Sequence, residues 1–310
     1  MRVTSNSFSD SLINNLQTLA RRQASLQNQI ASGQRVQDAA DDPLAAQEIL
    51  GLRDDSVATA QYQKNIGVHS EFAQAANGQI QSLQTIFNRA QEIAFTIDID
   101  SPEDLKSYGT EVAELIKEAV DVVNKQHRGE YLFGGTETAN PPFVATTDAQ
   151  NRVQSVAFQG NSTQPSSEIA SGVVISSRIP GENLTGTGEA GLVSDSRTGA
   201  DLFAHLVLLQ NQLFSGDAGA IQNTTRGELK KDEENILYHL ANNGALQSRL
   251  ESTLGTAKDD KLSIAGGLSQ RTDIDLSETI VRLTQQQTTY QATLQSAGSM
   301  LDLNLLSFLR

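Results

Sequence analysis

Apolar side chains recur at alternating spacings of four and three residues near both ends of the chain. One run covers Leu12 to Ile30 and the other covers Leu276 to Leu301, and each is interrupted once by a glutamine, Gln23 or Gln287. This spacing is typical of a coiled-coil seam, in which a single polar position fixes the register at some cost in stability. The two ends are therefore predicted to be long helices, the second of which starts at Asp275 as cap, with Glu278 three residues later completing a capping box. Their seams are Leu12, Leu16, Leu19, Leu26 and Ile30, and Leu276, Ile280, Leu283, Tyr290, Leu294, Ala297 and Leu301.

The faces opposite these seams are polar but carry no charge. No charged residue occurs between Leu283 and Leu301, or between Gln23 and Gln34. A helix that faces water normally has Lys and Glu opposite its apolar stripe. Two interpretations remain: an ordinary core helix, or a helix covered on several sides by other subunits. The second is favoured, because one narrow apolar stripe buries too little to offset the entropy of ordering so long a segment.

A second layer of helices is predicted between the ends. Asp42 can cap a helix that begins at Pro43, and the apolar pattern then continues to Ile97. If unbroken, this helix is roughly 80 Å long at about 1.5 Å per residue, which predicts a rod. A helix restarts near Ser101, and two more are predicted around residues 202–213 and 229–257.

Residues 136–197 have a different pattern. Phe143 to Gly160 is predicted to form two β-strands around a polar turn, and residues 171–191 one further strand with a Gly-rich tail. The bulky stretch Tyr131, Leu132 and Phe133, followed by Gly134 and Gly135, is predicted to fill the joint between helices and strands.

The predicted fold is therefore mainly α: a long antiparallel helical bundle or coiled-coil rod built from both chain ends, with a small β-rich insert. Three domains are expected, two of them made from separate stretches of the chain. They are a terminal helical domain (1–42 with 268–310), a helical rod (43–135 with 198–267) and the β-rich insert (136–197).

The composition of the chain excludes several classes of function. The 310 residues carry a net charge of −14, and no run of Lys and Arg is present, so nucleic acid is not an expected partner. The chain has no Cys, which excludes disulfides and thiol chemistry, and aromatic residues make up only 5%. We expect no cleaved leader, because the N-terminal residues lack an apolar core, and no membrane insertion.

Candidate chemistry is sparse. The histidines His69, His127, His205 and His239 have no metal-ligand spacing, and His69 is expected to be a satisfied packing residue. The stretch Gly186–Gly191 fits G-x-G-x-x-G, but no strand and helix frame it, so a turn is the better interpretation. We therefore predict no catalytic residues, no metal, no cofactor and no enzymatic activity.

Two stretches resemble a known family. ASGQRVQDAADDPLAAQEIL (31–50) and the C-terminal DIDLSETIVRL…LLSFLR (273–310) are similar to the bacterial flagellin superfamily. GEYLFGGTETANPPF (129–143), together with the chain length, is similar to the superfamily's hook–filament junction proteins. The resemblance covers both ends and the rod, whereas the insert matches only in position.

This resemblance implies a structural role in the bacterial flagellum, outside the cell, after type III export without a cleaved signal. Its expected partners are hook-associated protein 1, flagellin, further copies of the chain, and an export chaperone at Leu294–Arg310. Ser32, Gly33, Asp41, Asp42 and Pro43 would link the terminal domain to the rod. The expected subunit contacts are Leu12, Leu16, Leu19, Leu26, Ile30, Ile280, Leu283, Leu294 and Leu301.

Two other interpretations stay open at this point. One is a short filament flagellin, which copy number would distinguish from a junction protein. The other is a secreted helical effector or adhesin whose β-rich insert binds a ligand.

Overall fold

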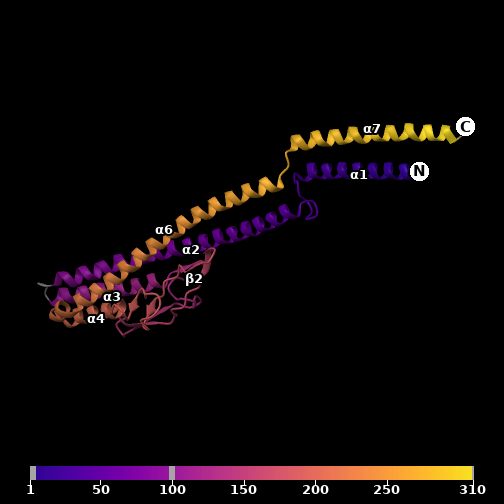
Figure 1. Cartoon of the computed structure of the whole chain (residues 1–310). Coiled ribbons are helices and arrows are strands. Elements are labelled where there is room, and N and C mark those ends of the chain that lie inside the picture. Colours follow the sequence, from indigo (N-terminus) through magenta and orange to yellow (C-terminus); the bar gives the residue numbers. More distant parts are fainter. Residues whose placement is uncertain (1–4, 98–101, 309–310) are drawn as a thin grey trace. The chain divides into compact units, whose positions relative to one another are not determined.

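The computed structural model describes the backbone of residues 5–97 and 102–308, and the side chains of residues 10–97 and 104–299. Long helices dominate it, as the sequence predicts (Figure 1). The helices are α1 (Ser5–Ser32), α2 (Pro43–Thr96), α3 (Pro102–Val123), α4 (Leu202–Ser215), α5 (Ala218–Ala220), α6 (Arg226–Thr272) and α7 (Leu276–Phe308), with a π-helical turn at Ile221–Thr225.

The predicted start signals of two helices are confirmed. The Asp42 carboxylate accepts a hydrogen bond from the Ala45 amide at 3.0 Å at the start of α2, and Asp275 accepts one from Glu278 at 3.0 Å at the start of α7. The second half of a capping box does not form at α7, because the Glu278 carboxylate pairs with Arg282 one turn later.

Short β-segments occupy the middle of the chain, mostly as hairpins. The hairpin predicted between Phe143 and Gly160 is present, with Phe143 opposite Phe158. A second hairpin, β5 with β6, turns at Gly172, where the sequence predicted only one strand. The strands are β1 (Gln126–His127), β2 (Glu130–Tyr131), β3 (Phe143–Thr147), β4 (Val153–Phe158), β5 (Ser167–Ala170), β6 (Val173–Ile175), β7 (Glu182–Asn183), β8 (Ser194–Asp195) and β9 (Ala200–Asp201).

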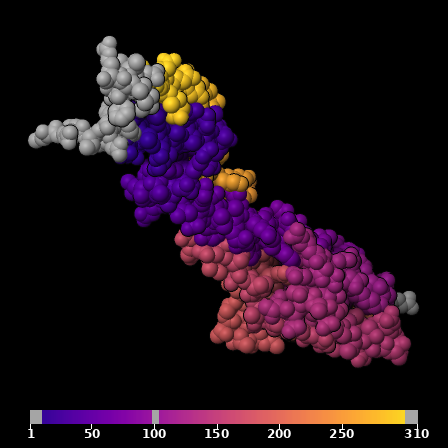
Figure 2. All heavy atoms as spheres, turned by 90° about the vertical axis from the view of Figure 1, so that its right-hand side faces the viewer, coloured from indigo at the N-terminus to yellow at the C-terminus, as the bar shows by residue number. Residues whose placement is uncertain are grey.

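The chain divides into two compact units. One contains Met1–Thr59 and Asp259–Arg310, and the other contains Ala60–Lys258. In the first unit α1 and α7 lie side by side, as both views show (Figures 1 and 2). A small core in the same unit joins Val36 to Ala45 and Ile49 of α2.

The second unit holds the main core. Side chains of α2, α3, α4 and α6 meet the β-segments there, and Phe87, Phe133 and Phe143 are fully buried in it. A smaller cluster lies beneath the β5–β6 hairpin, where Ile169 packs near Ile66 and Leu250. Gln63 donates to the Ala257 carbonyl and Asn243 to the Ala73 carbonyl, so α2 and α6 run antiparallel in this unit.

Candidate assembly interface

The pair of terminal helices is the first candidate site. All five seam residues of α1, Leu12 to Ile30, are half-buried, and none of residues 10–32 is fully buried. Contact with α7 includes a hydrogen bond from Gln286 Nε2 to the Leu19 carbonyl at 3.3 Å. The sequence placed the polar seam position one residue later, at Gln287, which is also half-buried. This pair therefore shields its apolar residues only partly.

The predicted seam of α7 is covered only in part. Leu283, Gln287 and Tyr290 are half-buried and Ala297 is buried, whereas Leu276, Ile280 and Leu294 are 52%, 46% and 45% exposed. Val281 is exposed beside them. The side chain of Leu301 lies outside the described residues. Large apolar side chains thus remain uncovered along a helix that carries no charge after Arg282 as far as Met300.

Threonines form a second feature of α7. The hydroxyls of Thr279, Thr284, Thr288, Thr289 and Thr293 each donate to the carbonyl four residues earlier, at 2.7–3.0 Å. A hydroxyl that bonds in this way satisfies its donor within its own helix. These threonine hydroxyls therefore need no outside acceptor when the helix is covered.

The segment between α1 and α2 is held by the end of α6 and the connection from α6 to α7. Gly33 ends α1 with a φ of 71°, the left-handed conformation in which glycine carries no steric cost. Its carbonyl accepts a hydrogen bond from the Ile274 amide at 3.1 Å, and the Arg35 amide donates to the Thr272 carbonyl at 2.6 Å. The predicted linker is thereby tied to the chain's other end.

Side chains complete this linker. The Ser32 hydroxyl accepts hydrogen bonds from Gln37 Nε2 and the Gln34 amide, and Asp41 accepts from the amides of Gln37 and Asp38. The bond from the Ala45 amide lowers the pKa of Asp42, and Arg35 at 3.3 Å contributes in the same direction. Of the five predicted linker residues, Ser32 and Asp41 are thus joined through Gln37, Gly33 bonds to Ile274, and Asp42 caps α2, which begins at Pro43.

The stretch from Tyr131 to Gly135 enters the core of the second unit. Leu132 and Phe133 are buried, and the Phe133 carbonyl accepts a hydrogen bond from Gly181 at 3.0 Å. Gly135 has a φ of 70°, and a Cβ there would lie 2.1 Å from the Asn161 carbonyl oxygen. A side chain at this position would therefore push the two segments apart.

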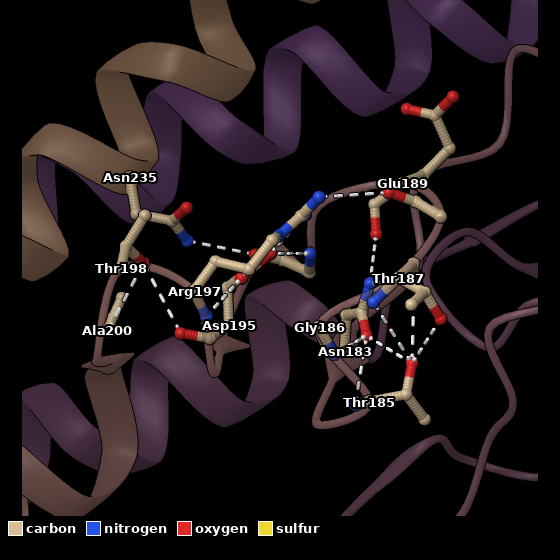
Figure 3. A network of polar contacts seen from close by, with 12 residues as sticks. Asn183, Thr185, Gly186, Thr187, Glu189, Asp195, Arg197, Thr198, Ala200 and Asn235 are labelled. Carbon is tan, nitrogen blue, oxygen red and sulfur yellow. Dashed lines mark hydrogen bonds and ion pairs between the residues drawn. The ribbon is translucent and has the colours of Figure 1, made fainter.

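A polar network that the sequence did not predict orders the Gly-rich loop (Figure 3). Asn183 Nδ2 donates to the carbonyls of Thr187 and Glu189 at 2.7 and 2.6 Å. Buried Asp195 accepts from Arg197 and from the Gly191 amide. Burial acts to raise the pKa of Asp195, but the Arg197 bonds outweigh it and the pKa is lowered. This loop is a braced turn, which supports the interpretation given to the G-x-G-x-x-G pattern.

Two groups next to this loop titrate abnormally. Burial, with a smaller contribution from Asp201, raises the pKa of Glu182 to about 7. His205 Nδ1 lies 2.8 Å from the buried Asp232 carboxylate. Burial alone acts to lower the pKa of His205, but Asp232, Asp201 and Glu228 together raise it. No sequence spacing signalled this pair, because the fold alone brings residues 27 positions apart into contact.

Within the described part of the chain, no cluster of three or more His, Cys, Asp or Glu side chains could hold a metal ion. Helices long and apolar enough to cross a bilayer are also absent from the part that the structure describes. His69 is buried, with its ring nitrogens bonded to Ser177 and Ser167, as expected for a satisfied packing residue.

Comparison with known proteins gives these features a context. Residues 3–138 match the family described as the bacterial flagellin N-terminal helical region. A curated relative, flagellar hook-associated protein 3 of Escherichia coli strain K12, is 24% identical over 287 residues, covering 89% of this chain and 90% of the relative. The chain is therefore similar to flagellar hook-associated protein 3 over most of its length.

Solved structures share the fold of this chain. A Vibrio parahaemolyticus protein assigned as flagellar hook-associated matches with a TM-score of 0.59 at 19% identity, over 75% of this chain and 100% of that one. Bacillus cereus FlgL matches with a TM-score of 0.55 at 17% identity, over 71% of this chain and 99% of that one. The predicted resemblance is thus confirmed in both sequence and fold.

Proposed function

We propose that this chain is a structural component of the bacterial flagellum and forms the junction layer between hook and filament. The similarity to hook-associated protein 3 of E. coli carries the proposal, because it extends over 89% of the chain and 90% of that relative. Its partners in this role are hook-associated protein 1 on one side, flagellin on the other, and further copies of itself in the layer. It acts outside the cell, after type III export.

The proposed contact surface is formed by α1 and α7. Its residues are Leu12, Leu16, Leu19, Leu26 and Ile30 with Ile280, Leu283, Leu294 and Leu301. Ile280 and Leu294 are about half exposed in the single chain, so a neighbouring subunit can cover them. The absence of charge from Leu283 to Met300 and the self-satisfied threonines keep the desolvation cost low around Leu294. The export chaperone would bind Leu294–Arg310, at the end of the same helix.

We also propose that the chain is divided into three domains with different roles. Residues 1–42 and 268–310 form the inner domain, residues 43–135 and 198–267 the rod, and residues 136–197 an outer insert. Ser32, Gly33 and Asp41–Pro43 link inner domain and rod, and Tyr131–Gly135 join rod and insert. The role is mechanical and needs no catalysis or cofactor.

Gene deletion tests the proposal directly. A deletion strain should assemble hooks that carry hook-associated protein 1, while flagellin is shed into the medium as monomer. Complementation with the wild-type gene should restore filaments. Filaments of normal length in the deletion strain would show that the chain is not the junction.

The abundance of the chain in filaments distinguishes a junction protein from a filament subunit. Quantitative mass spectrometry of sheared and purified filaments should find this chain at a small fraction of the major flagellin. Stoichiometric abundance along the filament would instead support a filament flagellin.

A further inference from the structure

Four acidic side chains and one histidine lie where α4 and α6 meet the three-stranded sheet of β7, β8 and β9. They are Glu182 of β7, Asp201 of β9, Glu228 and Asp232 of α6, and His205 of α4. The contact surface proposed above is formed by the terminal helices and does not use them. Neighbouring carboxylates repel one another unless a cation or a proton lies between them. The charge of this cluster therefore depends on pH.

His205 is the cation of the cluster when it is protonated. Its Nδ1 lies 2.8 Å from an Asp232 carboxylate oxygen, and its Nε2 lies 3.6 Å from a Glu228 carboxylate oxygen. The Asp232 side chain is fully buried, and its other oxygen accepts a hydrogen bond from the Asp201 amide at 2.8 Å. Asp232 therefore ties α6 both to α4 and to the end strand of the sheet.

Loss of the His205 proton weakens both of its contacts. A neutral imidazole has one N–H, so if Nδ1 donates to Asp232, Nε2 presents a lone pair to Glu228. Burial raises the pKa of Asp232, and its hydrogen bonds from His205 and the Asp201 amide counteract only part of that. Without the imidazolium, Asp232 must remain a buried, unpaired charge or take up a proton, and both cost free energy at alkaline pH.

The sheet places a second titrating group in the same cluster. Glu182 lies opposite Ser194 of β8, and Ser194 lies opposite Asp201 of β9, so the three residues form one row across the sheet. Side chains in one row point to the same face. Glu182 is half-buried, and burial together with the charge of Asp201 raises its pKa to about 7. When Glu182 ionises, a new negative charge therefore faces Asp201.

The other charged groups nearby do not replace these protons. Lys231 lies 2.6 Å from Glu228, but its side chain is 45% exposed, so water screens its charge. Arg197 is paired with Asp195. Burial lowers the pKa of His205, and three carboxylates of the cluster raise it by more. Although α3 also packs against α4, none of its described charged side chains contributes to that balance.

We propose that this cluster is a proton-dependent contact that joins the sheet and α4 to α6. It is strong while His205 is charged and Glu182 is neutral, and it weakens when both protons are lost. The two losses act together, because one removes a positive charge and the other adds a negative charge to the same group of carboxylates. Each of β7, β8 and β9 has only two residues, so few backbone hydrogen bonds resist their separation from α6.

Hydrogen exchange with mass spectrometry on the full-length chain tests the proposal. Exchange is measured at pH 6.0 and pH 8.5, and each rate is divided by the intrinsic rate at that pH to give the opening equilibrium constant. For residues 200–206 and 226–233 we expect this constant to be at least about tenfold larger at pH 8.5, because one pKa unit corresponds to a factor of about ten. Residues 80–90 of α2, in the main core, should change less than about threefold.

Matched variants identify the titrating groups. His205→Gln cannot be charged but can still donate a hydrogen bond to Asp232, and Glu182→Gln cannot ionise. Each should retain only part of the increase at residues 200–206, and the double variant should change less than about twofold. His127→Gln and Glu251→Gln, outside the cluster, should retain the whole increase. Circular dichroism confirms folding, and Glu182→Gln alone keeps the test decisive if His205→Gln does not fold.

Three outcomes would overturn the proposal. Opening constants at residues 200–206 that are equal at the two pH values would show that proton loss does not weaken the contact. An equal increase at residues 80–90 would show that pH acts on the whole unit instead. A full increase in the double variant, or in Glu182→Gln, would assign the titration to other groups.

Discussion

Arg128 adopts a backbone conformation that costs free energy. It stands in the two-residue turn between β1 and β2 with a φ of 55°, followed by Gly129 at 82°. Positive φ at both central positions is the requirement of a type I′ hairpin turn, in which Asn or Gly is preferred at the first. Arg128 also forms an ion pair with Glu71 at 3.1 Å, but both partners are about half exposed, so this pair contributes little.

We predict that Arg128→Asn is more stable than Arg128→Ala by about 1 kcal/mol, because asparagine tolerates the left-handed conformation and alanine does not. Both variants lose the ion pair with Glu71, so the difference between their free energies of unfolding reports the cost of the left-handed backbone conformation. Chemical denaturation followed by circular dichroism measures it. Equal midpoints for the two variants would mean that the turn relaxes in solution.

Glu182 links stability to pH. Its pKa is raised from 4.5 to about 7 in the folded chain, so between these values the folded state holds more protons than the unfolded state. Stability contributed by this group is therefore lost as the pH rises through that window. His205, whose pKa is also raised, contributes stability that is fully present at acidic pH and lost as the pH rises through its folded pKa.

We predict that Glu182→Gln is about 1–3 kcal/mol more stable than the wild type at pH 8 and nearly equal to it at pH 5, because the amide cannot ionise. Glu251→Gln, at an exposed position of α6, is the matched control and should show no such crossover. Urea unfolding at both pH values provides the measurement. A stability gain of Glu182→Gln that is the same at both would contradict the assignment.

At the scale of elements, α7 exposes large apolar side chains and carries no charged residue from Leu283 to Met300. Three of its seam leucines and isoleucines, Leu276, Ile280 and Leu294, are exposed, whereas Thr279 and Ala297 are buried. Substitution at an exposed position changes the stability of a single chain by less than about 0.5 kcal/mol. An effect on assembly can therefore be separated from an effect on folding.

We predict that Leu294→Asp leaves the single chain as stable as the wild type but abolishes filament formation, because a neighbour would bury an unpaired carboxylate at a cost of several kcal/mol. Leu184→Asp, which is also exposed but lies in the β-containing region, should assemble normally. Complementation of the deletion strain, scored by electron microscopy and motility, gives the readout. Normal filaments with Leu294→Asp would remove α7 from the proposed interface.

The sequence predicted the helices better than the strands. The starts of α2 and α7 could be predicted because helix capping is local. The carboxylates of Asp42 and Asp275 each accept a hydrogen bond from the amide three residues later. Strand β5 was missed, since Ile169 is its only large apolar residue, and its pairing with β6 depends on packing over α2 and α6. The Asp195–Arg197 and His205–Asp232 contacts were missed because burial, which gives them their properties, is a result of the fold.

At the scale of the whole molecule, the two compact units differ in how completely they bury their side chains. The unit of Ala60–Lys258 contains the large core with Phe87, Phe133 and Phe143. In the other unit, none of residues 10–32 is fully buried, and among residues 276–299 only Thr279 and Ala297 are. Segments with few buried contacts open at a lower free energy than the core does.

We predict that limited proteolysis of the free chain removes roughly the first and last few dozen residues before it cuts the unit of Ala60–Lys258, because local opening of weakly buried helices exposes their backbone to protease. Mass spectrometry of the fragments over time gives the order of cleavage. The same digestion of assembled filaments should leave α1 and α7 intact. Early cleavage in the β3–β4 hairpin, with both ends untouched, would contradict this order.

The threonine pattern of α7 has a consequence for how strictly a neighbour must be aligned. Since each of these hydroxyls points its hydrogen at a carbonyl of its own helix, a covering surface does not have to supply a matching acceptor at fixed intervals. Such a surface tolerates sliding and small rotations. A subunit that lies between two different lattices can then contact two different neighbours, because neither neighbour has to place hydrogen-bond acceptors opposite these threonines.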